Sequence, residues 1–219
     1  MRLLIAIPVL SNIPIEVCRG LCKSLVYMKD HDPDFEFDII YIKRTPIWKA
    51  RMLLWSMAKK YDFDKFMFLG DDIVLRDNTI HKLSCSDKKI ISGVYFERMP
   101  LHRPMVFKFD DNGECICDPI PINGEIQQVE GCGLDCILID KEYVKSISSD
   151  VFLPVGKATG DDISFMAYCK RNNIPVYVHT GCVVGHMNRQ DNIIGKAHYL
   201  KWKSLIDGMN KLKGISLWL

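Results

Sequence analysis

The stretch Lys65-Phe66-Met67-Phe68-Leu69-Gly70-Asp71-Asp72-Ile73-Val74-Leu75 decides the fold. It predicts a short buried strand from Lys65 to Leu69, followed by two adjacent carboxylates before apolar residues resume. Because neighbouring negative charges repel unless a cation lies between them, Asp71 and Asp72 indicate a metal site. Gly-Asp-Asp is equally good turn chemistry, so the stretch alone leaves both interpretations open.

The segments before this stretch alternate between apolar runs and helical periodicity. We expect a strand over residues 2–9, a helix over 14–27, a strand over 35–42 and a helix over 48–60. This alternation implies a parallel sheet with right-handed crossovers. Ligands bind such sheets at the carboxyl ends of the strands, which is where Asp71 and Asp72 emerge.

The second half of the chain has a different pattern. We expect strands over 89–95 and 134–139, a hairpin of 105–109 with 114–117, a helix over 162–172, strands over 176–178 and 182–184, and an amphipathic helix over 195–212. The hairpin indicates that the sheet becomes mixed. The predicted fold class is therefore α/β, a single domain with a Rossmann-like mixed central sheet, helices on both faces and a C-terminal amphipathic helix.

Composition narrows the class of protein. The 219 residues, 48% of them hydrophobic, suit one domain with a substantial core, and a net charge of +2 gives no reason to expect a nucleic-acid partner. The nine cysteines include no CxxC pair and no cysteine–histidine cluster at zinc spacing. No apolar run reaches the ~18 residues of a membrane span, and no cleavable signal is visible. We expect a reduced, cytoplasmic protein.

Two common phosphate-binding motifs are missing. Pro8-Val9-Leu10-Ser11-Asn12 stands where a dinucleotide-binding domain would carry GxGxxG, and the chain has no Walker A motif. Phosphate would then be held most simply by a metal ion and an arginine.

Four motifs follow one another in an order more specific than any of them alone. They are Ile7-Pro8, then Lys49-Ala50-Arg51, then Phe68 to Ile73, and finally a distal set. The distal set comprises Val129-Glu130-Gly131-Cys132-Gly133, Gly160-Asp161-Asp162-Ile163-Ser164-Phe165 and Val184-Gly185-His186. Their order resembles the glycosyltransferases of the GT-A fold, particularly the family-2-like inverting enzymes. The resemblance implies one GT-A type domain over residues 1–219, with a nucleotide-binding half (1–95) and an acceptor and catalytic half (96–219).

The resemblance implies a divalent metal site with a departure from the family's DxD motif. Aligned on the strand, the first acid of the motif falls on Gly70, which leaves Asp72 as the main metal ligand and Asp71 as a substitute for the missing contact. His186 would be a second ligand, and carboxylate with imidazole suits Mn²⁺ or Mg²⁺. The alternative for His186 is a hydrogen-bonded histidine at a strand end. The departure at Gly70 is the feature that motivates the alternative of a non-catalytic nucleotide-sugar-binding relative.

The resemblance also implies roles in catalysis and in nucleotide-sugar binding. Asp162 would be the general base, with Asp161 beside it at the acceptor, although acids at a helix start also cap helices. Donor binding would involve Asp71, Asp72 and four further residues, namely Pro8, Arg51, Gly131 and Gly133. A first-turn arginine is also a common surface charge, and the two glycines could merely supply positive φ.

A basic loop follows the predicted strand 89–95. Arg98, His102 and Arg103 lie where the family often has a mobile loop that covers substrate. For each of the three we expect an ordinary solvated loop residue instead.

The function that the resemblance implies is a metal-dependent inverting glycosyltransferase of hexosyltransferase type. It would move a sugar from a nucleoside-diphosphate sugar to a hydroxyl acceptor on a glycan, protein or lipid. The alternatives are a non-catalytic nucleotide-sugar-binding relative, and a metal-dependent phosphohydrolase or nucleotidyltransferase. The tail helix, with Trp202, Trp218 and several lysines, is compatible with a peripheral membrane contact or with packing against the domain.

Overall fold

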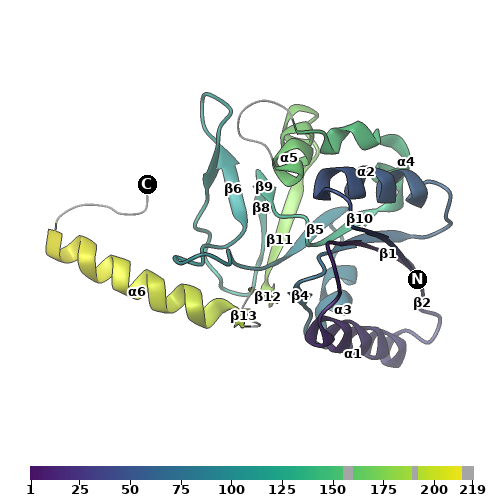
Figure 1. Cartoon of the computed structure of the whole chain (residues 1–219), viewed down its shortest axis with the longest axis horizontal. Coiled ribbons are helices and arrows are strands. Elements are labelled where there is room, and N and C mark those ends of the chain that lie inside the picture. The colour runs from purple at the N-terminus through teal and green to yellow at the C-terminus, as the bar shows by residue number, and fades with distance from the viewer. Residues whose placement is uncertain (155–159, 189–191, 214–219) are drawn as a thin grey trace.

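A computed structural model describes residues 1–154, 160–188 and 192–213. A seven-stranded central sheet has the order β2-β1-β3-β10-β5-β11-β8 (Figure 1). Its strands are β1 (Arg2–Val9), β2 (Glu36–Lys43), β3 (Lys65–Leu69), β5 (Ile90–Val94), β8 (Ile126–Val129), β10 (Cys136–Asp140) and β11 (Val176–Val183). Strand β1 pairs in parallel with β2 and β3, and β5 pairs in parallel with β11. Strand β10 runs antiparallel between β3 and β5, so the sheet is mixed.

Helices cover both faces of this sheet. They are α1 (Ile15–His31), α2 (Ile47–Ala58), α3 (Thr79–Ser84), α4 (Lys141–Ser146), α5 (Asp161–Arg171) and the short 3₁₀ helix η1 (Ser149–Phe152). Helices α1 and α3 lie on one face, and α2 and α5 lie on the other (Figure 1). The core under α2 is aromatic: the ring centroid of Trp55 lies 5.3 Å from that of Phe152 and 5.8 Å from that of Phe165. This packing holds α2 against the central sheet.

Two three-stranded sheets extend the domain beyond the central sheet. One contains β4 (Ile73–Val74), β12 (Gly185–Met187) and β13 (Ile193–Ile194), and the other contains β6 (Val106–Phe109), β7 (Cys115–Cys117) and β9 (Gly131–Cys132). Strand β12 pairs antiparallel with β4, so that His186 is opposite Ile73. The amide of Met187 donates to the carbonyl oxygen of Asp72 at 2.8 Å. The small sheet thereby carries His186 to the end of β3.

The helix α6 (Lys196–Lys213) extends away from the central sheet (Figure 1). Tyr199 and Ile206 are buried on its apolar face, and the Tyr199 ring stacks on Phe96 with 5.5 Å between the centroids. Trp202 is half-buried, whereas Trp218 lies outside the described residues. Over the described ranges, no helix has both the length and the apolar character that crossing a bilayer requires.

The predicted fold class is confirmed, including the mixed sheet and the helices on both faces. The strands predicted over 176–178 and 182–184 are wrong as two elements, because residues 176–183 form the single strand β11. Sequence periodicity missed the shortest elements, among them β4, α3, β9 and η1. All nine cysteines are free thiols in the structure.

Candidate functional site

The two acids after β3 face different partners. The Oδ2 atom of Asp71 accepts a hydrogen bond from the amide of Leu10 at 2.7 Å, which ties the end of β1 to the end of β3. Burial raises the pKa of Asp71, and the Leu10 amide opposes that rise. Pro8 lies two residues before this amide, within β1 and opposite Ile42 of β2.

Asp72 contacts the guanidinium of Arg98 and the imidazole of His186. Its Oδ2 accepts a hydrogen bond from Nη1 of Arg98 at 2.9 Å and lies 3.3 Å from Nε2 of His186. Burial alone would raise the pKa of Asp72, but His186 and Arg98 outweigh it and the pKa falls. The pKa of His186 is raised, since the contact with Asp72 outweighs the opposing effect of burial.

The geometry of His186 fits a metal ligand as well as an ion pair. Its Nδ1 lies 2.7 Å from the carbonyl oxygen of Phe96, and an Nδ1–H that donates there leaves the Nε2 lone pair facing Asp72 in the neutral ring. Among the described residues, no three histidine, cysteine or acidic side chains form a ready-made metal site. A pair of protein ligands suffices where substrate phosphates complete the coordination of Mg²⁺. The pair is therefore suited to a metal held jointly with a phosphate-bearing ligand.

Arg51 is buried, contrary to the surface position that a first-turn arginine usually takes. Its Nη1 donates to Asp161 and its Nη2 donates to Asp135, while its side chain is 4% exposed. Burial would lower the pKa of Arg51, but Asp135 and Asp161 outweigh it and raise the pKa. Arg51 thus joins the start of α2 to the start of α5 and to the turn before β10.

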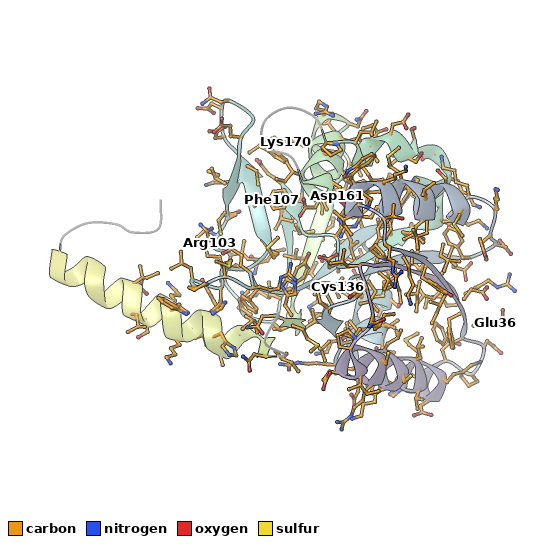
Figure 2. All side chains as sticks on the ribbon, in the orientation of Figure 1. Glu36, Arg103, Phe107, Cys136, Asp161 and Lys170 are labelled. Carbon is orange, nitrogen blue, oxygen red and sulfur yellow. The ribbon has the colours of Figure 1, made fainter. Side chains whose placement is uncertain are left out.

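Asp161 and Asp162 begin α5 and differ in environment. Asp161 is buried against Arg51, above the central strands (Figure 2). The Oδ1 of Asp162 accepts from the amide of Ile163 at 2.8 Å, whereas the N-cap residue Gly160 makes no side-chain cap. Burial raises the pKa of Asp162, Arg51 opposes the rise and Asp161 adds to it.

Asp162 also lines a cavity of about 190 Å³ together with residues of the β6–β7 hairpin. Phe107 and Arg103 lie along the same side of the molecule (Figure 2). A carboxylate with a raised pKa beside an open cavity can accept a proton from a bound hydroxyl group.

Asp135, which was not among the predicted site residues, lies at the centre of the site. Its Oδ1 accepts from Arg51, and its Oδ2 lies 3.3 Å from the hydroxyl of Tyr95. The available signal was a lone acid at the start of the strand predicted over 134–139. An antiparallel strand begins beside the carboxyl ends of its parallel neighbours, so such an acid belongs to the functional edge of the sheet.

Gly131 and Gly133 make room for aromatic side chains. A Cβ atom at Gly133 would lie 1.8 Å from the Tyr95 hydroxyl, and one at Gly131 would lie 2.1 Å from the Phe107 ring. Neither glycine has a positive φ, so that alternative is wrong. Their predicted contact with a sugar stays a prediction.

The loop after β5 is braced internally. Glu97 and Arg103 form a bidentate ion pair at 3.0 and 3.1 Å, and His102 is buried with its Nδ1 2.9 Å from the Glu97 carbonyl oxygen. The expectation of a solvated residue is wrong for His102, which is buried. It holds for Arg98, whose side chain is 51% exposed although it also pairs with Asp72. Arg103, with a side chain 34% exposed, is half-buried and paired.

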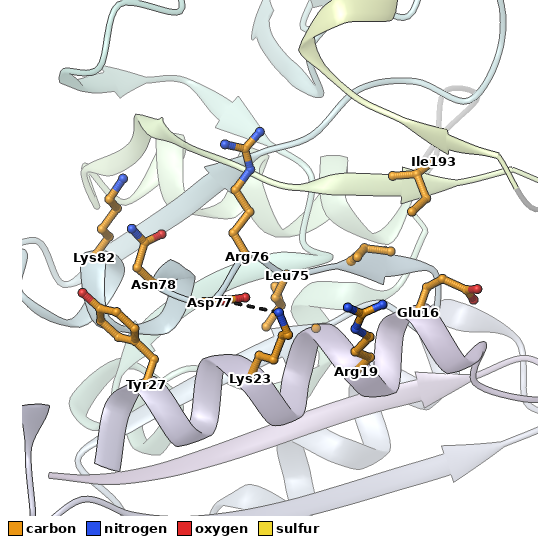
Figure 3. A pocket seen from close by; sticks show the side chains of 12 residues that line it. Glu16, Arg19, Lys23, Tyr27, Leu75, Arg76, Asp77, Asn78, Lys82 and Ile193 are labelled. Atoms are coloured by element: carbon orange, nitrogen blue, oxygen red, sulfur yellow. Dashed lines mark ion pairs between the residues drawn. The ribbon is translucent and has the colours of Figure 1, made fainter. Parts of the chain in front are cut away.

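A second cleft, of about 530 Å³, lies between α1 and the segment from β4 to α3 (Figure 3). Arg19, Lys23, Arg76 and Lys82 line it, with Nζ of Lys23 3.6 Å from Oδ2 of Asp77. None of the predicted site residues lines this cleft, so it is separate from the candidate site.

No protein-family model matches the chain, and no curated protein matches it. The structure is similar to that of A197 from STIV, with a TM-score of 0.59 and 20% identity over 89% of this chain and 94% of that one. Its TM-score is 0.42 with 4-diphosphocytidyl-2C-methyl-D-erythritolsynthase from Anaerococcus prevotii, at 11% identity over 94% and 99% of the two chains. The score is also 0.42 with S. aureus TarS 1-349, at 10% identity over 82% and 58%. The two TM-scores of 0.42 are too low to support any argument about activity. The TM-score of 0.59 with A197 shows a shared fold.

Proposed function

We propose that this chain is a metal-dependent inverting glycosyltransferase that moves a sugar from a nucleoside-diphosphate sugar to a hydroxyl acceptor. The observation that carries the proposal is the pairing of two chemistries at one edge of the sheet. Asp72 lies beside His186, and Asp162 lines a cavity near the buried Arg51 pair. Asp72 and His186 suit a metal-bound diphosphate, and Asp162 suits the removal of a proton from the acceptor.

Asp72 and His186 would hold the cation, Mn²⁺ or Mg²⁺, with Asp71 next to them. The cation, when bound, neutralises the charge that grows on the departing diphosphate. Arg98 already contacts Asp72, so its guanidinium is placed to meet the phosphate oxygens when a cation takes over that carboxylate. Arg51 is engaged with two acids and would act by positioning them.

Asp162 would be the general base. The acceptor oxygen attacks the anomeric carbon from the face opposite the diphosphate, and its proton moves to the Asp162 carboxylate. The bond between the anomeric carbon and the diphosphate oxygen breaks, its electron pair leaves with the nucleoside diphosphate, and the configuration inverts. Because burial raises the pKa of Asp162, its carboxylate is a stronger base than an exposed aspartate.

The test is a transfer and donor-hydrolysis assay over a panel of UDP- and GDP-sugars with Mn²⁺, using a mixture of glycan, peptide and lipid acceptors. We expect turnover on at least one donor, with inverted anomeric configuration by NMR. Asp72→Ala should abolish metal-dependent donor binding in calorimetry. Asp77→Ala is the matched control, because Asp77 is an exposed acid that lines the separate cleft.

Other results would favour the other functions. Metal-dependent binding of a donor without turnover on any acceptor would indicate a non-catalytic nucleotide-sugar-binding protein. Release of phosphate, or exchange of pyrophosphate, without sugar transfer would indicate a phosphohydrolase or a nucleotidyltransferase. Unchanged metal and donor binding by Asp72→Ala would contradict the metal site.

A further inference from the structure

The space beside Gly70 is filled by the side chain of Asp135. A Cβ atom at Gly70 would lie 2.9 Å from Cβ of Asp135 and 3.1 Å from its Oδ1. The backbones also meet, since the Gly70 amide donates to the Asp135 carbonyl oxygen at 2.9 Å. Strand β10 therefore delivers a carboxylate to the place where a side chain at position 70 would begin.

Neighbouring groups hold this carboxylate in place. Arg51 donates to Oδ1, the Tyr95 hydroxyl lies 3.3 Å from Oδ2, and the Asp135 amide donates to the same hydroxyl at 3.2 Å. The side chain of Asp135 is 26% exposed, against 4% for Arg51 and 7% for Asp161. A carboxylate offers about four acceptor positions, so Asp135 retains capacity for a ligand.

Asp135 lies between the two parts of the site. It is joined to the Asp161 side through Arg51 and abuts Gly70, which directly precedes Asp71. If the diphosphate binds at Asp72 and the acceptor oxygen binds at Asp162, the transferred sugar must bridge the gap. Asp135 is the partly exposed acid in that gap.

We infer that Asp135, whose side chain fills the space beside Gly70, accepts a hydrogen bond from a hydroxyl group of the transferred sugar. Arg51 and Tyr95 are its positioning residues. This inference rests on the proposed function and gives the chain a sugar-binding carboxylate from β10 instead of from the end of β3.

The first experiment compares calorimetric affinities for a nucleoside diphosphate and for the same nucleoside-diphosphate sugar, with Mn²⁺ present. We expect Asp135→Asn to weaken binding of the nucleotide sugar about 10- to 100-fold, as the loss of a charged hydrogen bond does, and to leave the sugar-free nucleotide within about 2-fold. An equal loss for both ligands would overturn the assignment to the sugar. Unchanged affinity for both would overturn any role of Asp135 in binding.

The second experiment moves the carboxylate from position 135 to position 70, on the other side of the contact between the two residues. It keeps the inference testable if the single variant fails to fold. Gly70→Asp collides with Asp135, so we expect it to lower the Tm, and Asp135→Gly in the same chain should relieve the collision. The double variant G70D/D135G should recover preferential binding of the nucleotide sugar. The matched double variant G70A/D135G should recover the Tm without that preference. Equal sugar affinity in the two double variants would overturn the inference.

These outcomes separate the inference from the proposed function. If the wild-type protein binds no nucleotide or nucleotide sugar, the proposed function fails and Asp135 loses its role with it. If the wild type binds and transfers while the Asp135 variants keep their preference for the nucleotide sugar, only the role of Asp135 fails.

Discussion

At the residue scale, Arg51 is a buried positive charge shared by two carboxylates. Its guanidinium also lies over the Phe68 ring, with Cζ 5.8 Å from the ring centroid. The two carboxylates keep Arg51 charged despite burial, and it in turn keeps two negative charges compatible with a nearly dry environment. Asp135 and Asp161 therefore share the single positive charge of Arg51.

We predict that Arg51→Met lowers the free energy of unfolding by about 3–5 kcal/mol, because it leaves the buried Asp161 and the partly buried Asp135 without their counter-charge. Urea unfolding followed by circular dichroism measures the change. Lys49→Ala removes an exposed charge from the same turn of α2 and should change stability by less than about 0.5 kcal/mol. Equal effects of the two substitutions would contradict the structural role of Arg51.

Asp162 leads to a prediction about pH. Its pKa in the folded protein lies above the ordinary 3.8, so the native state holds the proton over a range in which the unfolded chain has lost it. This group therefore contributes stability at low pH that is lost as the pH rises through the raised pKa. Asp162→Asn should unfold no more easily than wild type at pH 7, because it removes the cost of a buried charge and keeps an oxygen for the Ile163 amide.

The same group sets the pH dependence of transfer. The base must be ionised, so kcat/KM should fall as the pH drops through the raised pKa, at a higher pH than an ordinary aspartate would give. Asp162→Asn should lose transfer while retaining calorimetric donor binding. A variant that loses its fold instead would show that Asp162 stabilises the start of α5.

At the element scale, the site is built from strand ends and helix starts that the sequence predicts well. The strands over 2–9 and 65–69 match β1 and β3 to the residue, because long apolar runs with clear turn signals identify buried strands. Asp135 was not recognised, since its role depends on β10 lying beside β3. The contact of Arg98 with Asp72 was not predicted either, since it depends on the loop after β5 folding back. Such contacts arise from strand order, which local periodicity does not encode.

Gly133, in the turn between β9 and β10, packs closely against Tyr95, which directly follows β5. We predict that Gly133→Ala destabilises the protein by about 1–3 kcal/mol, because its methyl group would lie 1.8 Å from the Tyr95 hydroxyl. Gly195→Ala is the control, since a methyl group there meets nothing within 4 Å. Chemical unfolding of both variants decides the point, and equal stability would contradict the packing at Gly133.

At the scale of the whole molecule, one sheet unites the predicted nucleotide-binding and catalytic halves. Strand β10, from the second half, lies between β3 and β5 of the first. We predict that residues 1–95 expressed alone do not fold, because β3 and β5 lose the strand that connects them. The control is residues 1–208, which retain the buried Tyr199 and Ile206 and should give a dispersed amide NMR spectrum. A dispersed spectrum for the shorter fragment would contradict this prediction.

The central position of β10 also determines when the central sheet can form during synthesis. Strand β3 leaves the ribosome about 70 residues before its partner β10. Until β10 is made, the edge of β3 that will pair with it has no partner strand. Pairings so distant in sequence slow folding, because the chain must close a long loop before the contact contributes stability. Since His186 arrives later still, on β12, Asp72 meets this partner only after β12 has emerged. A nascent chain stalled before residue 187 should therefore lack the Asp72–His186 pair.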